Sequence, residues 1–264
     1  MRYSPLLFSL VLLSGVVHGK SYPTESYTMA PDEFKQCLTR LSEEAQQSGI
    51  EAGFAQNVLA DSQFMSNIIG YDRKQPEFSE SFSNYFGKRV TLWRINKGRK
   101  LFQEHKALLG KLYQTHGVPP HYLIAFWGLE TNFGSYKGKM PIIDALVTLA
   151  CDQRRSTFFT EELLNALKLM EKEGIAKEQM LGSWAGAMGH TQFMPSAYLK
   201  YAIDGDGDGR ADLWNSVPDA LTSAANFLKH LGWKSGFRWG REVVVVDGLD
   251  YAATGLDVKK SLYE

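Results

Sequence analysis

The sequence lacks an excess of charge of either sign, since 29 Lys and Arg residues balance 29 Asp and Glu residues. Proteins that bind nucleic acid normally carry a basic surface, so this balance argues against nucleic acid as a partner. It places no restriction on binding to a neutral sugar polymer. The sequence also lacks internal repeats and low-complexity tracts, so its organisation must be inferred from local patterns.

The N-terminal apolar run is too short to cross a bilayer as a stable helix, which needs about 20 apolar residues. This run, residues 5–17, follows Arg2 and precedes a Val17-x-Gly19 site. A positive residue, a short apolar core and a site of small residues are typical of a secretory signal peptide, so we expect residues 1–19 to be removed on export. A membrane anchor is the alternative. No cysteine lies near the predicted cleavage site, which argues against lipid attachment and favours a periplasmic mature protein.

Cysteine is scarce, with only Cys37 and Cys151 in the chain. An even number of cysteines in an exported protein is compatible with a disulfide, which we favour. Cys37 lies on the apolar stripe of a predicted helix, so two buried thiols are the alternative. The mature chain of about 245 residues is long enough for one large domain or two modest ones.

Helical periodicity covers most of the chain, and we expect a mainly α fold with a small β part, that is, an α+β fold dominated by helices. Apolar spacing, with Gly or Pro at the ends, predicts helices over residues 32–48, 54–69, 83–116, 120–132, 141–150, 158–173, 195–203 and 218–231. Only residues 243–246 have the pattern of a strand. Pro119 and Pro120 mark the predicted boundary between an N-terminal helical region, residues 27–118, and a core, residues 119–235.

Glu130 combines two features that favour a protonated carboxyl group. It follows Leu123 by seven positions, Phe126 by four and Trp127 by three, which places its side chain on the apolar stripe of a helix. It also lies at the C-terminal end of that helix, where the helix dipole disfavours negative charge. Both features raise a carboxyl pKa, and a general acid that works near neutral pH needs such a shift. The pattern alone is also compatible with a carboxylate in water at the rim of the helix.

An acidic loop follows the predicted helix over residues 195–203 and has the spacing of an EF-hand calcium loop, with Gly209 at its sixth position. The residues expected to bind the ion are Asp204, Asp206, Asp208, Asp212 and Asn215 through their side chains and Arg210 through its carbonyl group. Asn215 stands where such loops usually have a bidentate Glu, which should weaken Ca²⁺ binding or relax selectivity towards Na⁺. We predict a structural site that joins two helices. An acidic turn without an ion is the alternative.

The run Ala125-Phe-Trp-Gly-Leu-Glu-Thr-Asn-Phe-Gly134 resembles the catalytic segment of the lytic murein transglycosylase B family. The resemblance continues, in the same order, through Asp144-Ala-Leu146, Arg154-Arg155, the segment Gly186-Ala-Met-Gly-His-Thr-Gln-Phe-Met-Pro-Ser196 and Leu213-Trp214. The family consists of lysozyme-like enzymes that cleave peptidoglycan between N-acetylmuramic acid and N-acetylglucosamine. The resemblance therefore implies a lysozyme-like catalytic core, a monomer peripheral to the cell wall, and peptidoglycan glycan strands as the partner.

The resemblance also assigns roles to individual residues. Glu130 matches the family's single catalytic acid and base, and Ser183 matches a serine that orients the reacting sugar. Gln192 matches a glutamine that lines the glycan groove, and Arg154-Arg155 match a basic pair that extends towards the substrate. The alternatives are ordinary loop hydrogen bonding for Ser183 and Gln192 and a solvated charge pair for the arginines.

A lytic transglycosylase needs one carboxyl group where most glycosidases use two. The resemblance implies that the acetamido group of the sugar stabilises the cationic centre, and that its 6-hydroxyl attacks and gives a 1,6-anhydro product without a cofactor. None of the other nearby acids falls on the apolar stripe beside Glu130; these acids are Asp144, Asp152, Glu161 and Glu162. A muramidase that uses water, or a calcium-dependent glycan-binding module without catalysis, are the alternatives. Family members continue beyond the position of Glu264, so residues 236–264 are expected to begin a C-terminal β-containing segment.

Overall fold

The computed structural model describes residues 28–74 and 81–238 and, beyond these, Gly240, Val244, Gly248, Asp250 and Val258. The chain divides into two compact units, which meet in sequence between Lys234 and Ser235. The named helices and strands all belong to the first unit. The predicted signal peptide lies outside the described residues, as does the predicted strand over residues 243–246 apart from Val244.

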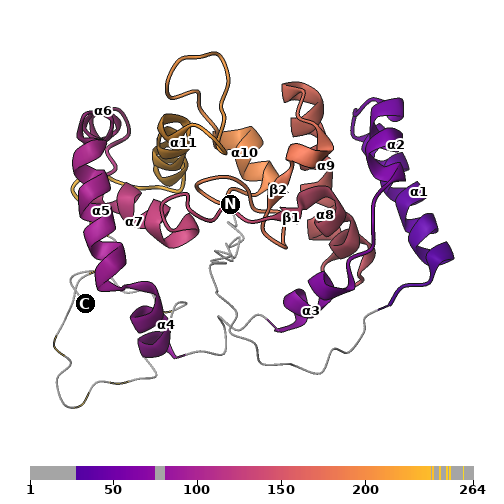
Figure 1. Cartoon of the computed structure of the whole chain (residues 1–264), viewed down its shortest axis with the longest axis horizontal. Coiled ribbons are helices and arrows are strands. Elements are labelled where there is room, and N and C mark those ends of the chain that lie inside the picture. Colours follow the sequence, from indigo (N-terminus) through magenta and orange to yellow (C-terminus); the bar gives the residue numbers. More distant parts are fainter. Residues whose placement is uncertain are drawn as a thin grey trace. The chain divides into compact units, whose positions relative to one another are not determined.

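The first unit is built almost entirely from helices, which confirms the predicted mainly α fold (Figure 1). Its α-helices are α1 (Pro31–Gln47), α2 (Ala52–Ala60), α3 (Ser66–Lys74), α4 (Phe82–Arg89), α5 (Leu92–Glu104), α6 (Lys106–His116), α7 (Pro120–Thr131), α8 (Ile142–Cys151), α9 (Ser156–Glu173), α10 (Pro195–Tyr201) and α11 (Val217–His230). A 3₁₀ turn, η2, covers Lys177–Gln179. The two short strands β1 (Met140–Pro141) and β2 (Leu181–Gly182) pair in antiparallel fashion, with Met140 opposite Gly182.

Two of the predicted helices are broken in the structure, so those predictions are wrong in detail. The segment predicted as one helix over residues 54–69 forms α2 and α3, because side chains of α8 bind the amides between them. Thr148 Oγ1 accepts from the amide of Met65, and Asp144 Oδ1 accepts from the amide of Gln63. The segment predicted over residues 83–116 forms α4, α5 and α6, and the hydroxyl of Thr91 begins α5 by accepting from the amide of Arg94.

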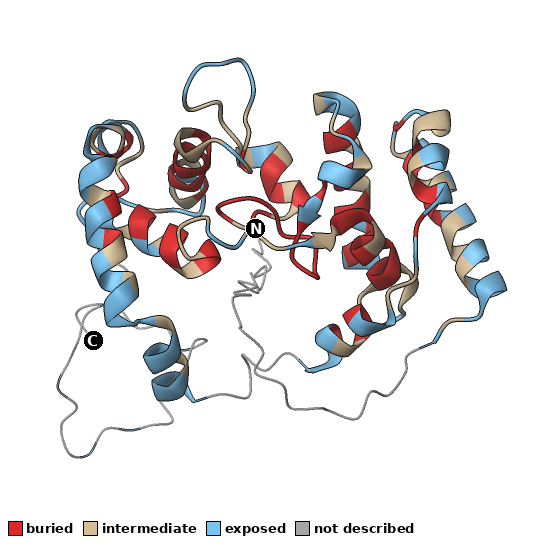
Figure 2. Cartoon of the chain, viewed as in Figure 1, coloured by how far each residue is buried: buried red, intermediate tan, exposed pale blue. Residues whose placement is uncertain are grey.

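The main hydrophobic core surrounds α8. Eight of the ten residues of α8 are buried, from Ile142 to Ala150 with Asp144 the exception, and Figure 2 shows this helix as an almost continuous buried segment. Helix α9 packs against it through Phe159, Leu163 and neighbouring residues, and α1, α2, α3, the segment after β2, α10 and α11 contribute further apolar side chains. Burying Leu or Phe side chains of this kind stabilises a fold by about 1.5–3 kcal/mol each.

A second hydrophobic cluster joins α5, α6, α7 and α11 through Leu101, Leu112, Leu123 and Leu221. Packing therefore crosses the domain boundary predicted between residues 118 and 119, since α6 precedes that boundary and α7 follows it. This cluster is the support on which α7, the helix of Glu130, is held.

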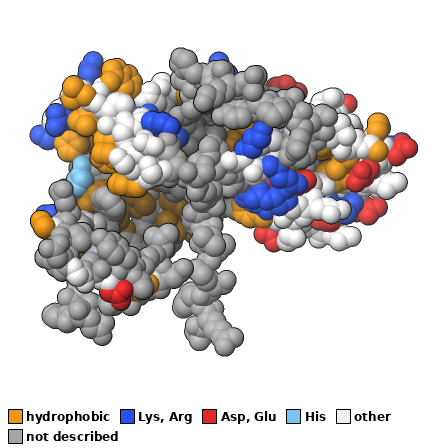
Figure 3. Space-filling model, turned by 90° about the horizontal axis from the view of Figure 1, so that it is seen from below, with side chains coloured by type: hydrophobic (Ala, Val, Ile, Leu, Met, Phe, Trp, Pro, Cys, Tyr) orange, Lys and Arg blue, Asp and Glu red, His pale blue; other side chains and the backbone are white. Residues whose placement is uncertain are grey.

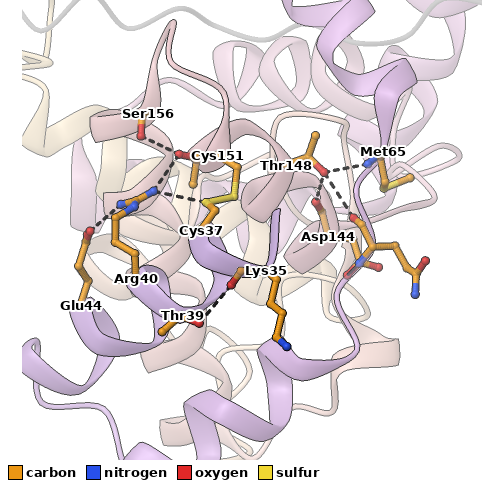
Figure 4. Close-up of a disulfide and its surroundings, with 12 residues drawn as sticks. Lys35, Cys37, Thr39, Arg40, Glu44, Met65, Asp144, Thr148, Cys151 and Ser156 are labelled. Carbon is orange, nitrogen blue, oxygen red and sulfur yellow. Dashed lines mark hydrogen bonds and ion pairs between the residues drawn. A yellow bond between two sulfur atoms is a disulfide. The ribbon is translucent and has the colours of Figure 1, made fainter. Parts of the chain in front are cut away.

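Cys37 and Cys151 form a disulfide that joins α1 to the end of α8 (Figure 4). Arg40, one turn further along α1, strengthens the same junction, because its guanidinium group donates to the carboxylate of Glu44 and to the carbonyl of Ala150. The structure therefore contains the predicted disulfide rather than two buried thiols. None of the helices in the described ranges is both long and apolar enough to cross a membrane.

Candidate active site

Glu130 is the penultimate residue of α7, and only 4% of its surface is exposed. Burial removes water from the carboxyl group and raises its pKa to about 8, while the positive charge of Arg89 opposes this shift in part. The carboxyl group is therefore protonated at neutral pH. The structure places it in the buried position that its spacing along the helix predicts.

The backbone that follows Glu130 turns sharply. Asn132 and Phe133 have φ angles of 51° and 60°, in the left-handed region that non-glycine residues rarely adopt. The amide of Phe133 donates to the carbonyl of Trp127, which closes the end of the helix. The ring of Phe133 packs so closely on Gly128 that a Cβ there would lie 2.7 Å from it. The positive φ angles of Asn132 and Phe133 each cost about 1–3 kcal/mol of folding free energy, and backbone strain of this kind is typical of functional sites.

His190 connects the end of α7 to the segment of small residues that follows β2. Its carbonyl accepts from the hydroxyl of Thr131 at 2.7 Å, and its Nδ1 accepts from Nε1 of Trp127 at 3.0 Å. Burial, and then the charge of Lys137, lower the pKa of His190 to about 4, so the ring is neutral and its proton is on Nε2. Gly134 leaves room for this ring, since a Cβ there would lie 2.1 Å from it. His190 thus holds the C-terminal end of α7, where Glu130 lies, through its contacts with Trp127 and Thr131.

Close backbone approach explains the glycines in the segment after β2. A Cβ on Gly182 would lie 2.1 Å from the carbonyl oxygen of Ala187, and a Cβ on Gly189 would lie 2.4 Å from that of Leu213. This is the close approach that the small residues predict. The segment folds back on itself through the bridges Gly182–Met188 and Met188–Phe193.

Ser183 and Gln192 both belong to this folded segment. The Oγ of Ser183 accepts from the amide of Ala187 at 2.9 Å, and the side chain is buried. Nε2 of Gln192 donates to the carbonyls of Lys137 and Gly189, and its backbone has a φ of 48°. His190, two residues before Gln192, contacts Thr131, so the structure brings Gln192 close to the end of α7. Ser183 belongs to the same folded segment through its contact with Ala187.

Arg154 and Arg155 lie between α8 and α9, and both form ion pairs with Asp72 of α3. No contact within the described ranges links them directly to Glu130. They adjoin the site through Tyr71 of α3, whose ring lies 6.4 Å from that of Trp184, the residue after Ser183. Sequence patterns did not indicate Asp72, because its partners lie 82 and 83 residues away.

The other acids considered for catalysis are engaged elsewhere. Glu162 is buried, and it accepts from the amide and hydroxyl groups of Ser196 at the start of α10. Asp144 pairs with Lys177, and Asp152 pairs with Arg73. The fourth of these acids, Glu161, is exposed on α9, so Glu130 is the one of them that combines burial with a pKa raised to about 8.

The acidic loop gathers three carboxylates, and one of them is a residue that the motif did not predict. Ligand atoms of Asp204, Asp206 and Asp219 all lie within 4.8 Å of one another. Asp219 is fully buried in the first turn of α11 and accepts from the amides of Gly205 and Asp212. The Ser216-x-x-Asp219 spacing of a helix N-terminus was the available signal.

Asp208, Asp212 and Asn215 do not belong to that group of three. Asp208 accepts from the amide of Arg210, and Asp212 accepts from the amide and side chain of Asn215. Asp204 accepts from three loop amides, and that of Gly209 contributes most to lowering its pKa. A cluster of carboxylate oxygens is the donor set that Ca²⁺ prefers, so the residues present fit this ion.

Together, the helical core and the buried acid at the end of α7 define a lysozyme-like domain. The family described as the Transglycosylase SLT domain matches residues 33–264, and this chain belongs to that family. The resemblance inferred from the sequence motifs is thereby confirmed.

Three relatives illustrate the match. Membrane-bound lytic murein transglycosylase B of Escherichia coli (strain K12) is 39% identical over 153 residues, which cover 58% of this chain and 42% of the relative. SltB3 of Pseudomonas aeruginosa, solved in complex with NAG-NAM-pentapeptide, has a TM-score of 0.77 and 38% identity, covering 83% of this chain and 59% of SltB3. Escherichia coli Slt35, solved in complex with calcium, has a TM-score of 0.68 and 31% identity, covering 78% of this chain and 65% of Slt35. This chain thus spans about two fifths of its curated relative.

Proposed function

We propose that this chain is a lytic transglycosylase that cleaves the β-1,4 bond between N-acetylmuramic acid and N-acetylglucosamine in peptidoglycan. The observation that carries the proposal is the buried carboxyl group of Glu130, whose pKa is raised to about 8. Membership of the transglycosylase family supports it. So do the fragments found in SltB3, which was solved with NAG-NAM-pentapeptide and with NAG-anhNAM-pentapeptide.

Glu130 performs both proton transfers in this reaction. As an acid it protonates the oxygen that leaves when the glycosidic bond breaks, while the acetamido group of the sugar stabilises the cationic centre. As a carboxylate it then removes the proton of the 6-hydroxyl group, whose oxygen attacks the anomeric carbon and gives the 1,6-anhydro product. General acid–base help of this kind contributes a factor of about 10²–10⁴. The intramolecular attack has an effective molarity on the order of 10⁵ M or more.

Ser183, Gln192, Arg154 and Arg155 bind the glycan strand in this proposal. Ser183 Oγ already accepts from the amide of Ala187, so its O–H remains available as a donor to a sugar oxygen. Nε2 of Gln192 donates to two backbone carbonyls, which leaves its side-chain oxygen as an acceptor for a sugar hydroxyl.

A structural Ca²⁺ belongs to the same proposal. Asp204, Asp206 and Asp219 would hold it, and it would neutralise three clustered negative charges between α10 and α11. The calcium complex of Slt35 supports the choice of ion. Export to the periplasm, with loss of residues 1–19, completes the proposed setting.

Two other functions remain to be separated by experiment. A muramidase would use the same acid with water as the attacking group, and one similar solved structure is described as a muramidase/transglycosylase. A glycan-binding module would hold the strand without cleaving it. The decisive experiment is digestion of purified sacculi followed by mass analysis. Anhydro products, one water lighter than hydrolysis products, support a transglycosylase. Hydrated products support a muramidase, and an absence of soluble products supports a binding module.

A further inference from the structure

Asp72, near the C-terminal end of α3, is a carboxylate with only 1% of its surface exposed. Its Oδ2 lies 2.5 Å from Nη1 of Arg154, and its Oδ1 lies 3.1 Å from Nη1 of Arg155. Nη1 of Arg154 also donates to the backbone carbonyl of Asp72 at 2.6 Å. One buried residue therefore holds both arginines.

Further contacts fix the surroundings of this carboxylate. The guanidinium group of Arg73 lies 3.8 Å from Asp72 and donates to both oxygens of Asp152, at 2.7 and 2.9 Å. The guanidinium group of Arg155 lies 4.7 Å from the ring centre of Phe159, a cation–π contact. The cluster has three arginines and two aspartates, so a net positive charge remains on it.

Each arginine retains capacity to bind a ligand. The side chains of Arg154 and Arg155 are 41% and 28% exposed, although their partner is buried. Asp72 accepts from Nη1 of each arginine. A guanidinium group has five N–H donors in a fixed plane, so each arginine keeps further donors for a ligand. The surface seen from below shows Lys and Arg side chains gathered beside acidic side chains (Figure 3).

The same end of α3 contacts the segment that holds Ser183. Tyr71, the residue before Asp72, lies 6.4 Å from Trp184 between ring centres. Tyr71 is about half exposed, whereas Trp184 is buried. The end of α3 therefore adjoins both the arginine pair and the serine assigned to substrate binding.

We propose that Asp72 is a positioning residue, which holds the guanidinium groups of Arg154 and Arg155 in the orientation that binds the glycan substrate. Asp72 itself touches no substrate. Long arginine side chains lose conformational freedom when a ligand immobilises them, and a partner that fixes them beforehand removes this cost from binding. Loss of the partner should then weaken substrate binding and leave the chemical step unchanged. The proposal rests on the function proposed above.

The first test separates binding from chemistry in Asp72→Asn, which keeps the size of the side chain and removes its charge. We expect KM for soluble peptidoglycan strands to rise about tenfold, with kcat within about twofold of wild type. Residues that orient metal-binding side chains have an effect of about this size on affinity when they are replaced. Asp72→Glu keeps the charge and should recover most of the affinity, whereas Asp72→Ser also removes the charge and replaces Asp72→Asn if that variant fails to fold. An unchanged KM in the folded variant that lacks the charge would overturn the proposal.

The matched control is Asp144→Asn. Asp144 is also a largely buried acid, with 13% of its side chain exposed. It ties the connection between α2 and α3 to α8 through the amide of Gln63, and it pairs with Lys177. It contacts neither arginine of the pair. We expect this variant to lose stability without a change in KM. A rise in KM equal to that of Asp72→Asn would show a general loosening of α3 and would contradict a specific role.

A double-mutant comparison tests whether Asp72 acts through the arginines. In the background of Arg154→Gln with Arg155→Gln, the groups that Asp72 orients are absent, so Asp72→Asn should add no further rise in KM. A full additional rise would mean that Asp72 acts by another route.

Side-chain NMR of ¹⁵N-labelled arginine gives a readout that needs no turnover. The Nε–H groups of Arg154 and Arg155 should be rigid in the wild-type protein and in Asp144→Asn, and mobile in Asp72→Asn. If the wild-type protein fails to cleave peptidoglycan, the proposed function fails while this measurement still decides the positioning role. Equal mobility in wild type and Asp72→Asn would refute that role.

Discussion

Two carboxyl side chains are buried to nearly the same degree, yet their surroundings differ in kind. Glu130 at the end of α7 is 4% exposed, and Asp72 near the end of α3 is 1% exposed. Burial raises the pKa of Glu130 to about 8, and Arg89 offsets only part of the shift. Asp72, in contrast, forms ion pairs with Arg154, Arg155 and Arg73. Burial alone therefore does not define the surroundings of a carboxyl group, because Asp72 is enclosed by cationic partners.

The comparison assigns different tasks to the two ends of the site. The end of α7 carries Glu130, the proposed proton-transfer group, and His190 holds this end in place. The end of α3 carries an anion that holds two cations in place. Changes at the first end should therefore alter kcat, and changes at the second should alter KM.

The largest expected effect is that of Glu130→Gln. The amide is nearly the same size as the carboxyl group but cannot donate a catalytic proton, so kcat should fall by a factor of about 10²–10⁴ or more. Release of soluble fragments from purified sacculi measures this loss, and Asp72→Asn is the comparison that should keep its kcat. Digestion by Glu130→Gln at near the wild-type rate would remove Glu130 from the mechanism.

The disulfide joins α1 to the end of α8, just before the segment that carries the arginine pair. Cys151 closes a loop of 114 residues and directly precedes the segment that leads to Arg154. Chain-entropy arguments give about 4–5 kcal/mol for such a bridge, with measured values often lower. Replacing Cys37 and Cys151 by Ser should lower the free energy of unfolding by up to that amount and raise KM, with the pKa of Glu130 unchanged.

Urea unfolding measures the effect, and Thr39→Ala, an exposed change on α1, is its control. That control should change the free energy of unfolding by less than about 0.5 kcal/mol. A double serine variant as stable as the control would show that the bridge contributes nothing to the fold.

The pKa of Glu130 also predicts how stability depends on pH. The folded state keeps a proton that the unfolded state releases above its ordinary pKa of 4.5. The free energy of unfolding should therefore fall as pH rises from about 4.5 to about 8. At 1.36 kcal/mol per pKa unit, the loss reaches about 3 kcal/mol at pH 7.

Glu130→Gln has no such group, so it should be more stable than wild type at pH 7 and similar to it near pH 4. Thermal unfolding of both proteins across this range measures the difference. A constant difference between the two proteins across the range would mean that Glu130 does not hold a proton in the folded state.

Calcium should have the smallest effect on stability, and this effect should be felt at the end of α7, where Glu130 lies. The amide of His190 donates to the carbonyl of Leu213, which lies within the acidic loop, so an ordered loop supports the contacts of His190 with the end of α7. We expect a dissociation constant of roughly 10⁻⁴ M or weaker, and stabilisation of about 1.4 kcal/mol at ten times that concentration. Asp206→Asn should abolish the calcium-dependent rise in Tm, whereas the exposed Glu178→Gln should retain it. A Tm of the wild-type protein that does not respond to calcium would contradict the proposed site.

Local patterns predicted those features that depend on neighbours in the sequence. The apolar spacing around Glu130 predicted its burial, and the acidic loop was found from its own spacing. The break between α2 and α3 escaped prediction because side chains of α8, some 80 residues away, bind the amides there. Asp72 escaped for the same reason, since its partner Arg154 lies 82 residues away. Asp219 is only seven residues from Asp212, whose amide it binds, and it was missed because it lies outside the spacing of the EF-hand motif.

The most direct test of the account is the titration of Glu130 itself. Carbon-13 NMR of carboxyl-labelled glutamate can follow its ionisation, with the resonance assigned by its loss in Glu130→Gln. The account predicts a midpoint near pH 8, with the group protonated at neutral pH. A midpoint near 4.5 would mean that Glu130 is an ordinary ionised carboxylate and would contradict its role as the catalytic acid.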